Sequence, residues 1–338
     1  MSIDEKIFSK FWHLLCHRKE VENNNDYLKI KTPIGDVVAF NDNGNIVVFD
    51  NICPHRGSFI FSESHGRKSA TCPYHGWTFA YGEMIIPSGD FFKKCKVDKV
   101  SLRFFKIEWV GDFIFFGVEP ELDVYEQLGA VAEILENISF NLNERIDFSH
   151  YEYECSWPLA IENALEPYHI SMVHGETLAK LKLEEGVNEF FGVNSIWKTN
   201  VGDKGVEKKL LGLNKFFNID YQHPGYVNIF IYPFSMISST FGYSYSLQNF
   251  FPHKSDREKT YFYSRLLSAN IKKPEFSKVL EGFFESTASV NRKVFQEDHD
   301  VCKNIPLTSW SMEPLKYPNI MEERIDHFRS VCKKYAEY

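Results

Sequence analysis

The chain has 338 residues, 43% hydrophobic and 25% charged, a balance typical of globular proteins. This length allows one large domain or two ordinary ones, each with a buried core. The net charge of −8 argues against nucleic acid as a partner, because phosphate-backbone binding needs a basic surface. No apolar stretch approaches the ~18 residues of a membrane span, and the N-terminus does not resemble a secretory signal. We therefore expect no membrane association.

Between about residues 28 and 118 the sequence predicts short β-strands joined by tight turns. Apolar runs at 37–40 and 46–49 flank the turn signal at 41–44, which predicts a hairpin. A second strand–turn–strand pattern covers 102–116, with its turn at Gly111 and Asp112. The N-terminal part is therefore expected to be all-β.

The pattern changes near residue 120, where a looser, partly helical connection begins and runs to about residue 148. Helix is expected over 158–185, with a disturbance at Pro167, and strands rich in Phe and Tyr over 225–266. Two further helices are expected at 274–303 and 318–336. We predict an α+β protein with domains at 1–120, including an N-terminal helix, and at 121–338.

Two short loops each contain one cysteine and one histidine. The first holds Cys53 and His55, and the second, after sixteen intervening residues, holds Cys72 and His75. Two thiolates and two imidazoles could form a tetrahedral zinc site, although zinc fingers usually place the two Cys before the two His. A Rieske [2Fe–2S] centre needs two thiolates on one iron and two imidazoles on the other, which converging mixed loops can supply.

The cysteines as a group do not suggest disulfides. Seven is an odd number, and the residues are scattered along the chain. We expect a reducing, cytoplasmic location, which leaves thiolates free for metal binding. The five cysteines outside the loops are interpreted as inert thiols: Cys16, Cys95, Cys155, Cys302 and Cys332.

A second candidate metal site lies at residues 162–175. Glu162, Glu166 and His169 are spaced i, i+4 and i+7, so on a continuous helix they would share one face. His174 follows His169 by five residues, which leaves the two ~140° apart on a straight helix. Both can bind one ion only if the helix distorts or ends between them, and Pro167 promotes such a distortion.

Two histidines and one carboxylate form the facial triad of non-haem Fe(II) oxygenases. We expect the third ligand on the helix at 274–303, where Asp298 follows Val290 and Val294 on one apolar stripe. An unpaired carboxylate there would be costly, which favours a metal partner. The neighbouring Glu297 and Asp300 are expected to point elsewhere, and they are the alternatives if the phase of the helix is misjudged.

The two cysteine–histidine loops, with their His-Arg-Gly and His-Gly-Trp flanks, resemble the Rieske domain of ring-hydroxylating oxygenases. The resemblance implies that Cys53 and Cys72 bind one iron and that His55 and His75 bind the other. Glu162, Glu166, His169 and His174 are similarly spaced to the acidic and histidine residues of the oxygenase α-subunit, and Glu297 with Asp298 matches its later acidic pair.

This α-subunit resemblance covers nearly the whole chain. It implies a C-terminal helix-grip domain, in which an antiparallel sheet wraps around a long helix and encloses a mononuclear Fe(II) and the substrate pocket. It also implies a homotrimer in which the cluster of one subunit serves the iron of its neighbour. Glu166 would then be the acidic bridge between centres. Most relatives have Asp there, whereas the branch similar to carnitine and choline monooxygenases has Glu.

The expected function is an oxygenase that uses O2 to hydroxylate or oxidatively demethylate a small organic substrate. No GxGxxG segment is evident, so NAD(P)H is expected to be oxidised by a separate reductase, with or without a ferredoxin. One alternative is a Rieske electron-transfer protein with an appended domain. Another is a ligand-binding protein with an inactive iron site. Iron content separates the oxygenase from both.

Three further groups of residues have two readings each. Asn163 is either a partner of the iron site or a surface amide. The lysine-rich run 93–96 is either a solvated loop or a docking patch for a redox partner. The third group is expected on one strand because of its even spacing, and it belongs either to the core of a sheet or to an apolar pocket: Tyr226, Phe230, Tyr232 and Phe234.

Overall fold

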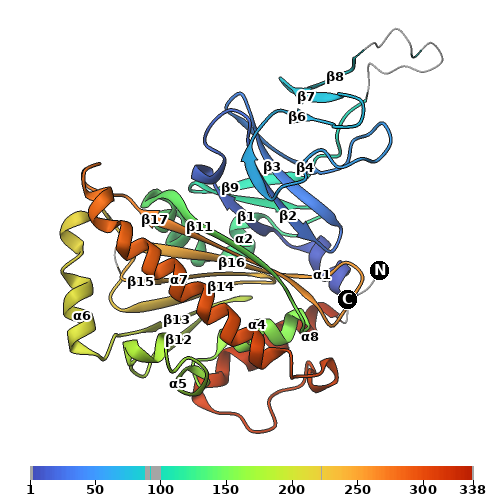
Figure 1. The fold of residues 1–338 in the computed structure, drawn as a ribbon. Coiled ribbons are helices and arrows are strands. Elements are labelled where there is room, and N and C mark those ends of the chain that lie inside the picture. The colour runs from blue at the N-terminus through green and yellow to red at the C-terminus, as the bar shows by residue number, and fades with distance from the viewer. Residues whose placement is uncertain (1–2, 88–91, 93–99, 222, 337–338) are drawn as a thin grey trace.

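The computed structural model describes all residues except 1–2, 88–91, 93–99, 222 and 337–338. A smaller β-rich part carries strands β1 to β10 and projects from a larger part built around one broad sheet (Figure 1). The lysine run at 93–96, with Cys95, lies outside the described residues, so its reading stays a prediction. No helix among the described residues is both long and apolar enough to cross a membrane.

The N-terminal part consists of small antiparallel sheets. Their orders are β1-β10-β9, β4-β3-β2-β5 and β6-β7-β8. Its elements are α1 (Ile3–Lys10), β1 (His13–His17), η1 (Arg18–Val21), β2 (Asp26–Thr32), β3 (Gly35–Asp42), β4 (Asn45–Asp50), β5 (His65–Arg67), β6 (Ala70–Thr71), β7 (Thr78–Ala80), β8 (Glu83–Ile85), β9 (Lys106–Val110) and β10 (Phe113–Gly117).

The two predicted hairpins are present. β3 pairs with β4 across Asn43 and Gly44, whose φ angles are 54° and 89°. Successive positive φ values suit a tight two-residue hairpin turn, and Asn and Gly are the residues that adopt them most readily. β9 pairs with β10 across Gly111 and Asp112, again as the sequence predicted.

The C-terminal part is built on a seven-stranded antiparallel sheet of order β11-β17-β16-β15-β14-β13-β12. Its elements are α2 (Val124–Leu128), α3 (Val131–Phe140), β11 (Leu142–Tyr153), α4 (Trp157–Leu165), α5 (Ile170–Val173), η3 (Leu178–Leu181), β12 (Val187–Phe191), β13 (Asn194–Thr199), α6 (Lys204–Leu211), η4 (Asn214–Phe216), β14 (Tyr226–Ile231), β15 (Ser235–Thr240), β16 (Ser244–Pro252), β17 (Thr260–Ala269), α7 (Phe276–Cys302), η5 (Leu307–Ser309), η6 (Ile320–Glu322) and α8 (Glu323–Ala336).

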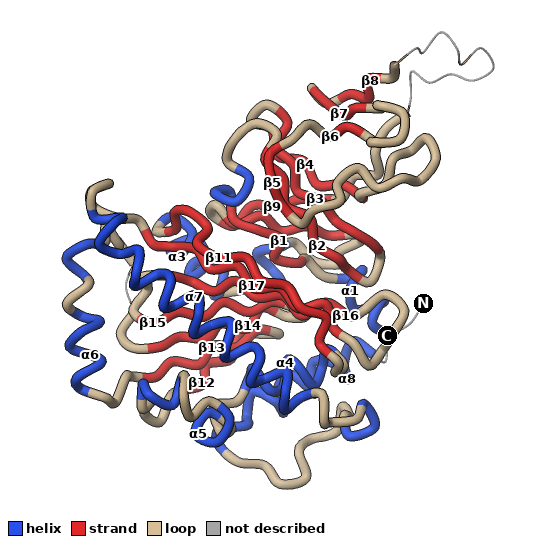
Figure 2. The backbone as a smooth tube through the Cα atoms, viewed as in Figure 1, coloured by secondary structure: helices blue, strands red, loops and turns tan. Residues whose placement is uncertain are grey.

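Helices cover both faces of this sheet. The long helix α7 runs across one face (Figure 2), where Phe295 packs against Phe262 with ring centroids 4.9 Å apart. On the other side, Leu247 and Leu267 share an apolar cluster with Leu135 of α3. Every residue of β16 is consequently buried. The predicted α+β class, with an antiparallel sheet gripping a long helix, is confirmed.

The N-terminal helix is anchored on the C-terminal part. Phe8 of α1 stacks on His13 at 4.2 Å between centroids, and its ring lies 6.1 Å from that of Phe234. The two parts therefore share an apolar cluster across the predicted boundary at residue 120.

Two secondary-structure predictions were wrong in detail. The expected helix over 158–185 is divided into α4, α5 and the 3-10 turn η3. The aromatic residues at 226–234 do not lie on one strand, because β14 ends at Ile231 and both Tyr232 and Phe234 fall in its connection to β15. The even spacing of these aromatic residues continues past Ile231 in the sequence, but the strand itself ends there in a turn.

Candidate metal sites

The two cysteine–histidine loops have nearly the same backbone structure. Gly57 N–H donates to the carbonyl of Cys53, and Gly76 N–H donates to that of Cys72, each at 3.0 Å. Both glycines have positive φ, 75° and 73°, a conformation that glycine adopts at no steric cost. The loops follow β4 and β6, so two strand ends present matching cysteine and histidine pairs.

The four predicted cluster residues lie together at the junction of these loops. The rings of His55 and His75 are 4.6 Å apart, and His55 also stacks on Trp77 at 4.6 Å. Cys53 and Cys72 are each 2% exposed, and their thiols hydrogen-bond to one another. Although burial opposes it, N–H groups of the second loop lower the pKa of Cys72, which favours the thiolate that binds metal.

These residues fit a two-iron cluster better than one zinc ion. His55 Nδ1 is buried without a hydrogen-bond partner, as expected of a ring nitrogen that faces a metal. A single tetrahedral zinc, with bonds of about 2.0–2.3 Å, would draw its donors to within about 4 Å of each other. Among the described residues, no three of these four donor atoms lie within 4.8 Å of one another. The donor atoms of a second set of residues, described next, do meet this distance.

The second set is created by a break in the chain at Glu166. Helix α4 ends at Leu165, and Glu166 is extended, with φ −113° and ψ 137°. A residue before proline is driven out of helical geometry by the ring of the next residue, here Pro167. His169 and His174 then flank the single turn of α5. The predicted distortion therefore occurs, and it lets both imidazoles turn toward one point.

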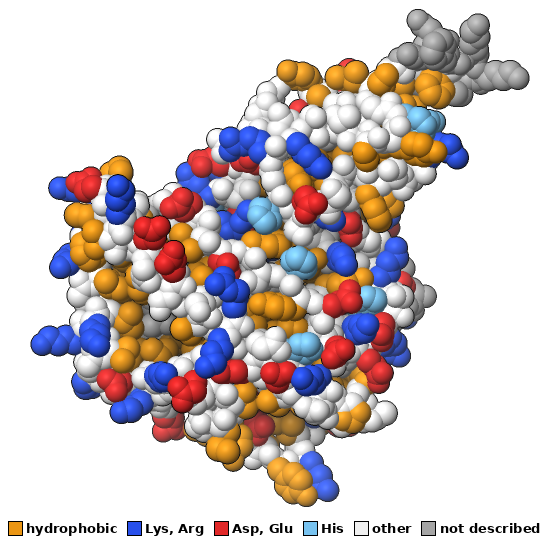
Figure 3. Space-filling view, viewed as in Figure 1, with side chains coloured by type: hydrophobic (Ala, Val, Ile, Leu, Met, Phe, Trp, Pro, Cys, Tyr) orange, Lys and Arg blue, Asp and Glu red, His pale blue; other side chains and the backbone are white. Residues whose placement is uncertain are grey.

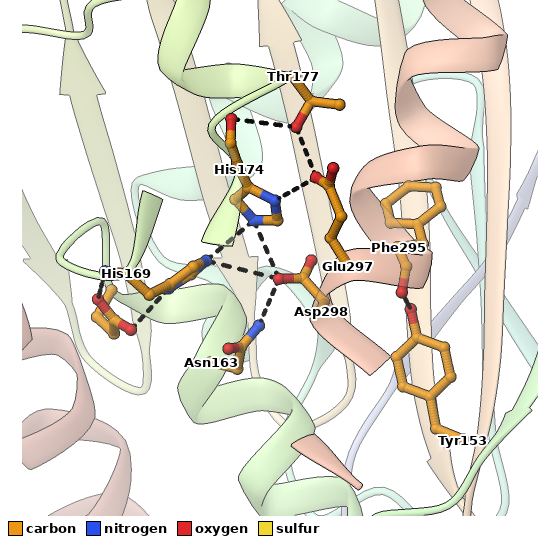
Figure 4. A network of polar contacts seen from close by, with 9 residues as sticks. Tyr153, Asn163, His169, His174, Thr177, Phe295, Glu297 and Asp298 are labelled. Atoms are coloured by element: carbon orange, nitrogen blue, oxygen red, sulfur yellow. Dashed lines mark hydrogen bonds and ion pairs between the residues drawn. The ribbon is translucent and has the colours of Figure 1, made fainter. Parts of the chain in front are cut away.

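Asp298 of α7 completes this set (Figure 4). Its Oδ1 lies 3.1 Å from His174 Nε2 and 3.5 Å from His169 Nε2, and the two Nε2 atoms are 3.1 Å apart. Among the described residues, this is the one group of three or more candidate ligands whose donor atoms converge so closely. Two imidazoles and one carboxylate in this arrangement can hold one divalent ion and leave other positions open.

Each member of the set is oriented by a further polar residue. His169 Nδ1 lies 2.7 Å from Glu166 Oε1, and His174 Nδ1 lies 2.8 Å from Glu297 Oε2. Asn163 donates to Asp298 Oδ1 at 2.8 Å, so it contacts the site and is not a surface amide. Nδ1–H donation to a carboxylate leaves Nε2 free to bind a metal, and such contacts fix the ring orientation.

The electrostatics of the site follow from this contact network. Burial alone would lower the pKa of His169, but hydrogen bonds to Asp298 and Glu166 raise it to about 9. The same imidazoles hold the pKa of Asp298 at about 2 despite its burial. The protein thus concentrates negative charge around two imidazole nitrogens, which suits a bound cation.

Two contacts differ from what the sequence suggested. Glu162 does not share a helix face with His169, because the helix ends between them; instead it binds Arg329 through two contacts of 2.7 and 2.9 Å and accepts from Trp310. Glu297 does not point elsewhere, since it bonds His174 and also accepts from Thr177 Oγ1 at 2.7 Å. Asp300 does point away and pairs with Lys303.

A cavity of about 70 Å³ opens beside the histidines and Asp298. Tyr226 lines this cavity, whereas Phe230 belongs to the apolar core, so the aromatic residues of β14 divide between the two readings. Its other walls are partly apolar and partly polar: Ala164, Leu165, Glu166, Pro167, Ile170, Leu178, Trp197, Asn228, Met236, Gln248, Val294, Phe295 and Arg324. Arg324 and Thr177 had no distinguishing pattern in the sequence.

Comparison with known families agrees with both sites. Residues 11–88 match the Rieske [2Fe-2S] domain, and residues 142–337 match the catalytic domain of the ring hydroxylating alpha subunit. The chain therefore belongs to the ring-hydroxylating oxygenase alpha-subunit family, with a Rieske [2Fe–2S] domain and a non-haem iron catalytic domain.

Several characterised proteins are similar in sequence. The carnitine monooxygenase oxygenase subunit of Acinetobacter pittii is 29% identical over 50% of this chain and 48% of its own length. The anthranilate 1,2-dioxygenase large subunit of Acinetobacter baylyi is 24% identical over 54% and 42%. The chain thus aligns with about half the length of these curated relatives.

Solved structures show the same fold across nearly the whole chain. The quaternary ammonium Rieske monooxygenase CntA, in complex with an inhibitor, superposes with a TM-score of 0.75 at 20% identity, covering 98% of this chain and 91% of that one. Naphthalene 1,2-dioxygenase with indole bound gives a TM-score of 0.75 at 17% identity, with 98% and 88% covered.

Proposed function

We propose that this protein is a Rieske oxygenase component that hydroxylates or oxidatively demethylates a small organic substrate with O2. In this proposal a separate NAD(P)H-dependent reductase, with or without a ferredoxin, supplies the electrons in the cytoplasm. The convergence of His169, His174 and Asp298 beside a cavity carries the proposal. A ferrous ion held there would supply open coordination positions for O2 and substrate.

We assign Cys53 and Cys72 to one iron of the cluster, and His55 and His75 to the other. The matching loop geometry, the buried thiols and the unpartnered Nδ1 of His55 support this assignment. Two imidazoles in place of two thiolates raise the reduction potential of such a cluster.

We assign His169, His174 and Asp298 as the ligands of the mononuclear iron. Their second contacts support this choice, because Glu166 and Glu297 each accept from an Nδ1 and thereby present Nε2 to the metal. Asn163 donates to Asp298 and restricts its rotation.

We further propose that Glu166 is the acidic bridge between centres in a homotrimer, bonded to His169 and to His75 of the partner subunit. Its contact with His169 occupies one carboxylate oxygen, and the other accepts from the His169 backbone. Next to it, Tyr168 and Met172 are 63% and 87% exposed, and exposed apolar side chains of this size are common at subunit interfaces.

Iron content and oxygen labelling test the function. We expect about three irons per chain, a Rieske paramagnetic resonance signal after reduction, and transfer of label from isotopic O2 into a product of a substrate screen with a surrogate reductase. Two irons per chain without labelled product would instead indicate an electron-transfer or ligand-binding protein. A colourless protein with one zinc would refute the cluster assignment.

Variants of single residues separate the two centres within the same assay. His169→Ala should lose the mononuclear iron and labelled product but keep the Rieske signal. Glu166→Gln should keep both centres and lose most product. His150→Ala, which removes an exposed imidazole of β11, is the matched control and should behave as wild type. A Glu166→Gln variant as active as wild type would remove the bridge from the proposal.

A further inference from the structure

Arg324 is a buried cation on the wall of the cavity beside the metal ligands. It lies at the start of α8 and is 1% exposed. Its guanidinium donates to Ser195 Oγ at 3.0 Å and to Asn228 Oδ1 at 2.9 Å, with longer contacts of 3.3 and 3.4 Å to the carbonyls of Leu165 and Ser195. All four acceptors are neutral.

The other strongly buried arginines have carboxylate partners. Arg329, five residues along the same helix, forms a two-point pair with Glu162 at 2.7 and 2.9 Å. Arg265, fully buried, has Glu20 at 3.6 Å. In the described part of the chain no carboxylate lies within 4.0 Å of Arg324, so its charge stands without a counter-ion.

Such a charge is expensive to bury. An unpaired ion in a protein interior loses its hydration at a large cost in free energy, and neutral acceptors offset only part of that cost. Burial lowers the pKa of Arg324 to about 9, so the group is still a cation at neutral pH. Its five N–H groups make four contacts, which leaves one Nη1 hydrogen without an acceptor among the described residues.

The cavity offers no other anion for this role. Asp298 is bonded to the two histidines and Asn163, and Glu166 is bonded to His169. Tyr226 lines the same cavity, but burial raises its pKa, so the phenol stays neutral. The remaining lining combines apolar and aromatic side chains, including Trp197 and Phe295, with the neutral amides of Asn228 and Gln248.

We infer that Arg324 binds a carboxylate of the substrate, so that the protein acts on a small organic carboxylate. The carboxylate accepts from the guanidinium, and the body of the molecule lies between Trp197 and Phe295 and reaches the metal ligands. The free Nη1 hydrogen gives the carboxylate one charge-assisted hydrogen bond, and the charge of the guanidinium persists at neutral pH. The inference rests on the proposed function, since it takes this cavity as the place where substrate binds.

Binding without turnover tests the inference. The iron-loaded protein, kept anaerobic and without reductant, is titrated calorimetrically with acetate and benzoate and with their neutral analogues acetamide and benzamide. A charge-assisted bond to Arg324 predicts that at least one carboxylate binds ~10-fold more tightly than its amide. Arg324→Gln should abolish this preference, and Arg324→Lys should restore part of it.

Arg103→Gln is the control, because it removes an equal charge from a side chain that is 61% exposed and outside the cavity; it should keep the preference. A purely structural role would lower the melting temperature of Arg324→Gln and leave the preference for carboxylate unchanged. An unchanged preference in Arg324→Gln would overturn the inference. Equal binding of acid and amide to the wild-type protein, or no binding of either, would also overturn it. Labelled product from an uncharged substrate would leave the proposed oxygenase function standing while the inference failed.

Discussion

At the scale of single residues, the mononuclear site depends on carboxylates that contact the ligand histidines and are not themselves assigned as ligands. Glu297 lies next to Asp298 on α7, yet its Oε2 bonds both His174 Nδ1 and Thr177 Oγ1. It therefore sets the ring orientation of one ligand and ties the segment after α5 to α7. Partners of this kind commonly affect metal binding almost as strongly as the ligands themselves.

We predict that Glu297→Gln weakens mononuclear iron binding by about 10- to 100-fold, because the amide cannot accept from both groups as an anion. Chelator competition followed by iron analysis measures the effect. Glu285→Gln, an exposed carboxylate on the same helix, is the control and should retain wild-type affinity. Unchanged affinity in Glu297→Gln would show that Thr177 and packing orient His174 sufficiently.

At the scale of elements, α4 is attached to α8 by a buried ion pair. Glu162 Oε1 and Oε2 accept from Arg329, and Trp310 Nε1 donates to the same carboxylate at 2.9 Å. Because α4 leads directly into the break at Glu166, this attachment also positions the segment that carries both histidines. Removal of one partner would leave a buried charge without compensation.

Glu162→Gln is accordingly predicted to destabilise the protein by about 3–5 kcal/mol, the usual cost of breaking a buried pair on one side. Urea unfolding of the variant against wild type measures this loss. Arg329→Met alone should be similarly destabilising, while Glu162→Gln with Arg329→Met should recover part of the stability. Strictly additive losses would contradict coupling between the two residues.

At the scale of the whole molecule, the N-terminal and C-terminal parts share an apolar cluster that includes α1 and the sheet. His13 of β1 is enclosed there by Phe8, Phe116, Phe234 and Phe251. Burial lowers the pKa of His13 to about 4, so the folded protein keeps this imidazole neutral. On the surface, by contrast, Figure 3 shows acidic and basic residues interspersed on the face that carries α7.

We therefore predict that lowering the pH reduces the free energy of unfolding, because His13 is protonated more readily in the unfolded chain than in the folded protein. Its pKa is about 6.5 when unfolded and about 4 when folded, so below pH 6.5 the unfolded chain takes up a proton that the folded chain does not. This stabilisation is complete above pH 6.5 and is lost as the pH falls toward 4, by about 2 kcal/mol between pH 7 and pH 5.

Urea unfolding at the two pH values checks this expectation. His13→Gln, which has no titratable ring, should lose about 2 kcal/mol less than wild type over the same interval. Equal pH dependence in His13→Gln and wild type would mean that His13 does not contribute.

Local sequence alone determined much of this protein. The spacing of Cys53 with His55 and Cys72 with His75 predicted the cluster loops, and Pro167 predicted the break that turns His169 and His174 together. The Asn43-Gly44 turn predicted its hairpin. These features depend on neighbours within a few residues, whose backbone preferences and ligand spacing can be read directly from the chain. The boundary at residue 120 stays a prediction.

Contacts between distant segments were decided only by the tertiary structure. Asp298 was expected near the histidines, but the contacts of Glu297 with His174 and of Glu162 with Arg329 span more than 120 and 160 residues in sequence. Arg324 could not be distinguished from a surface arginine. Periodicity indicates which face of a helix is buried, but not which partner a polar group on that face will meet, because that partner is chosen by the packing of whole elements.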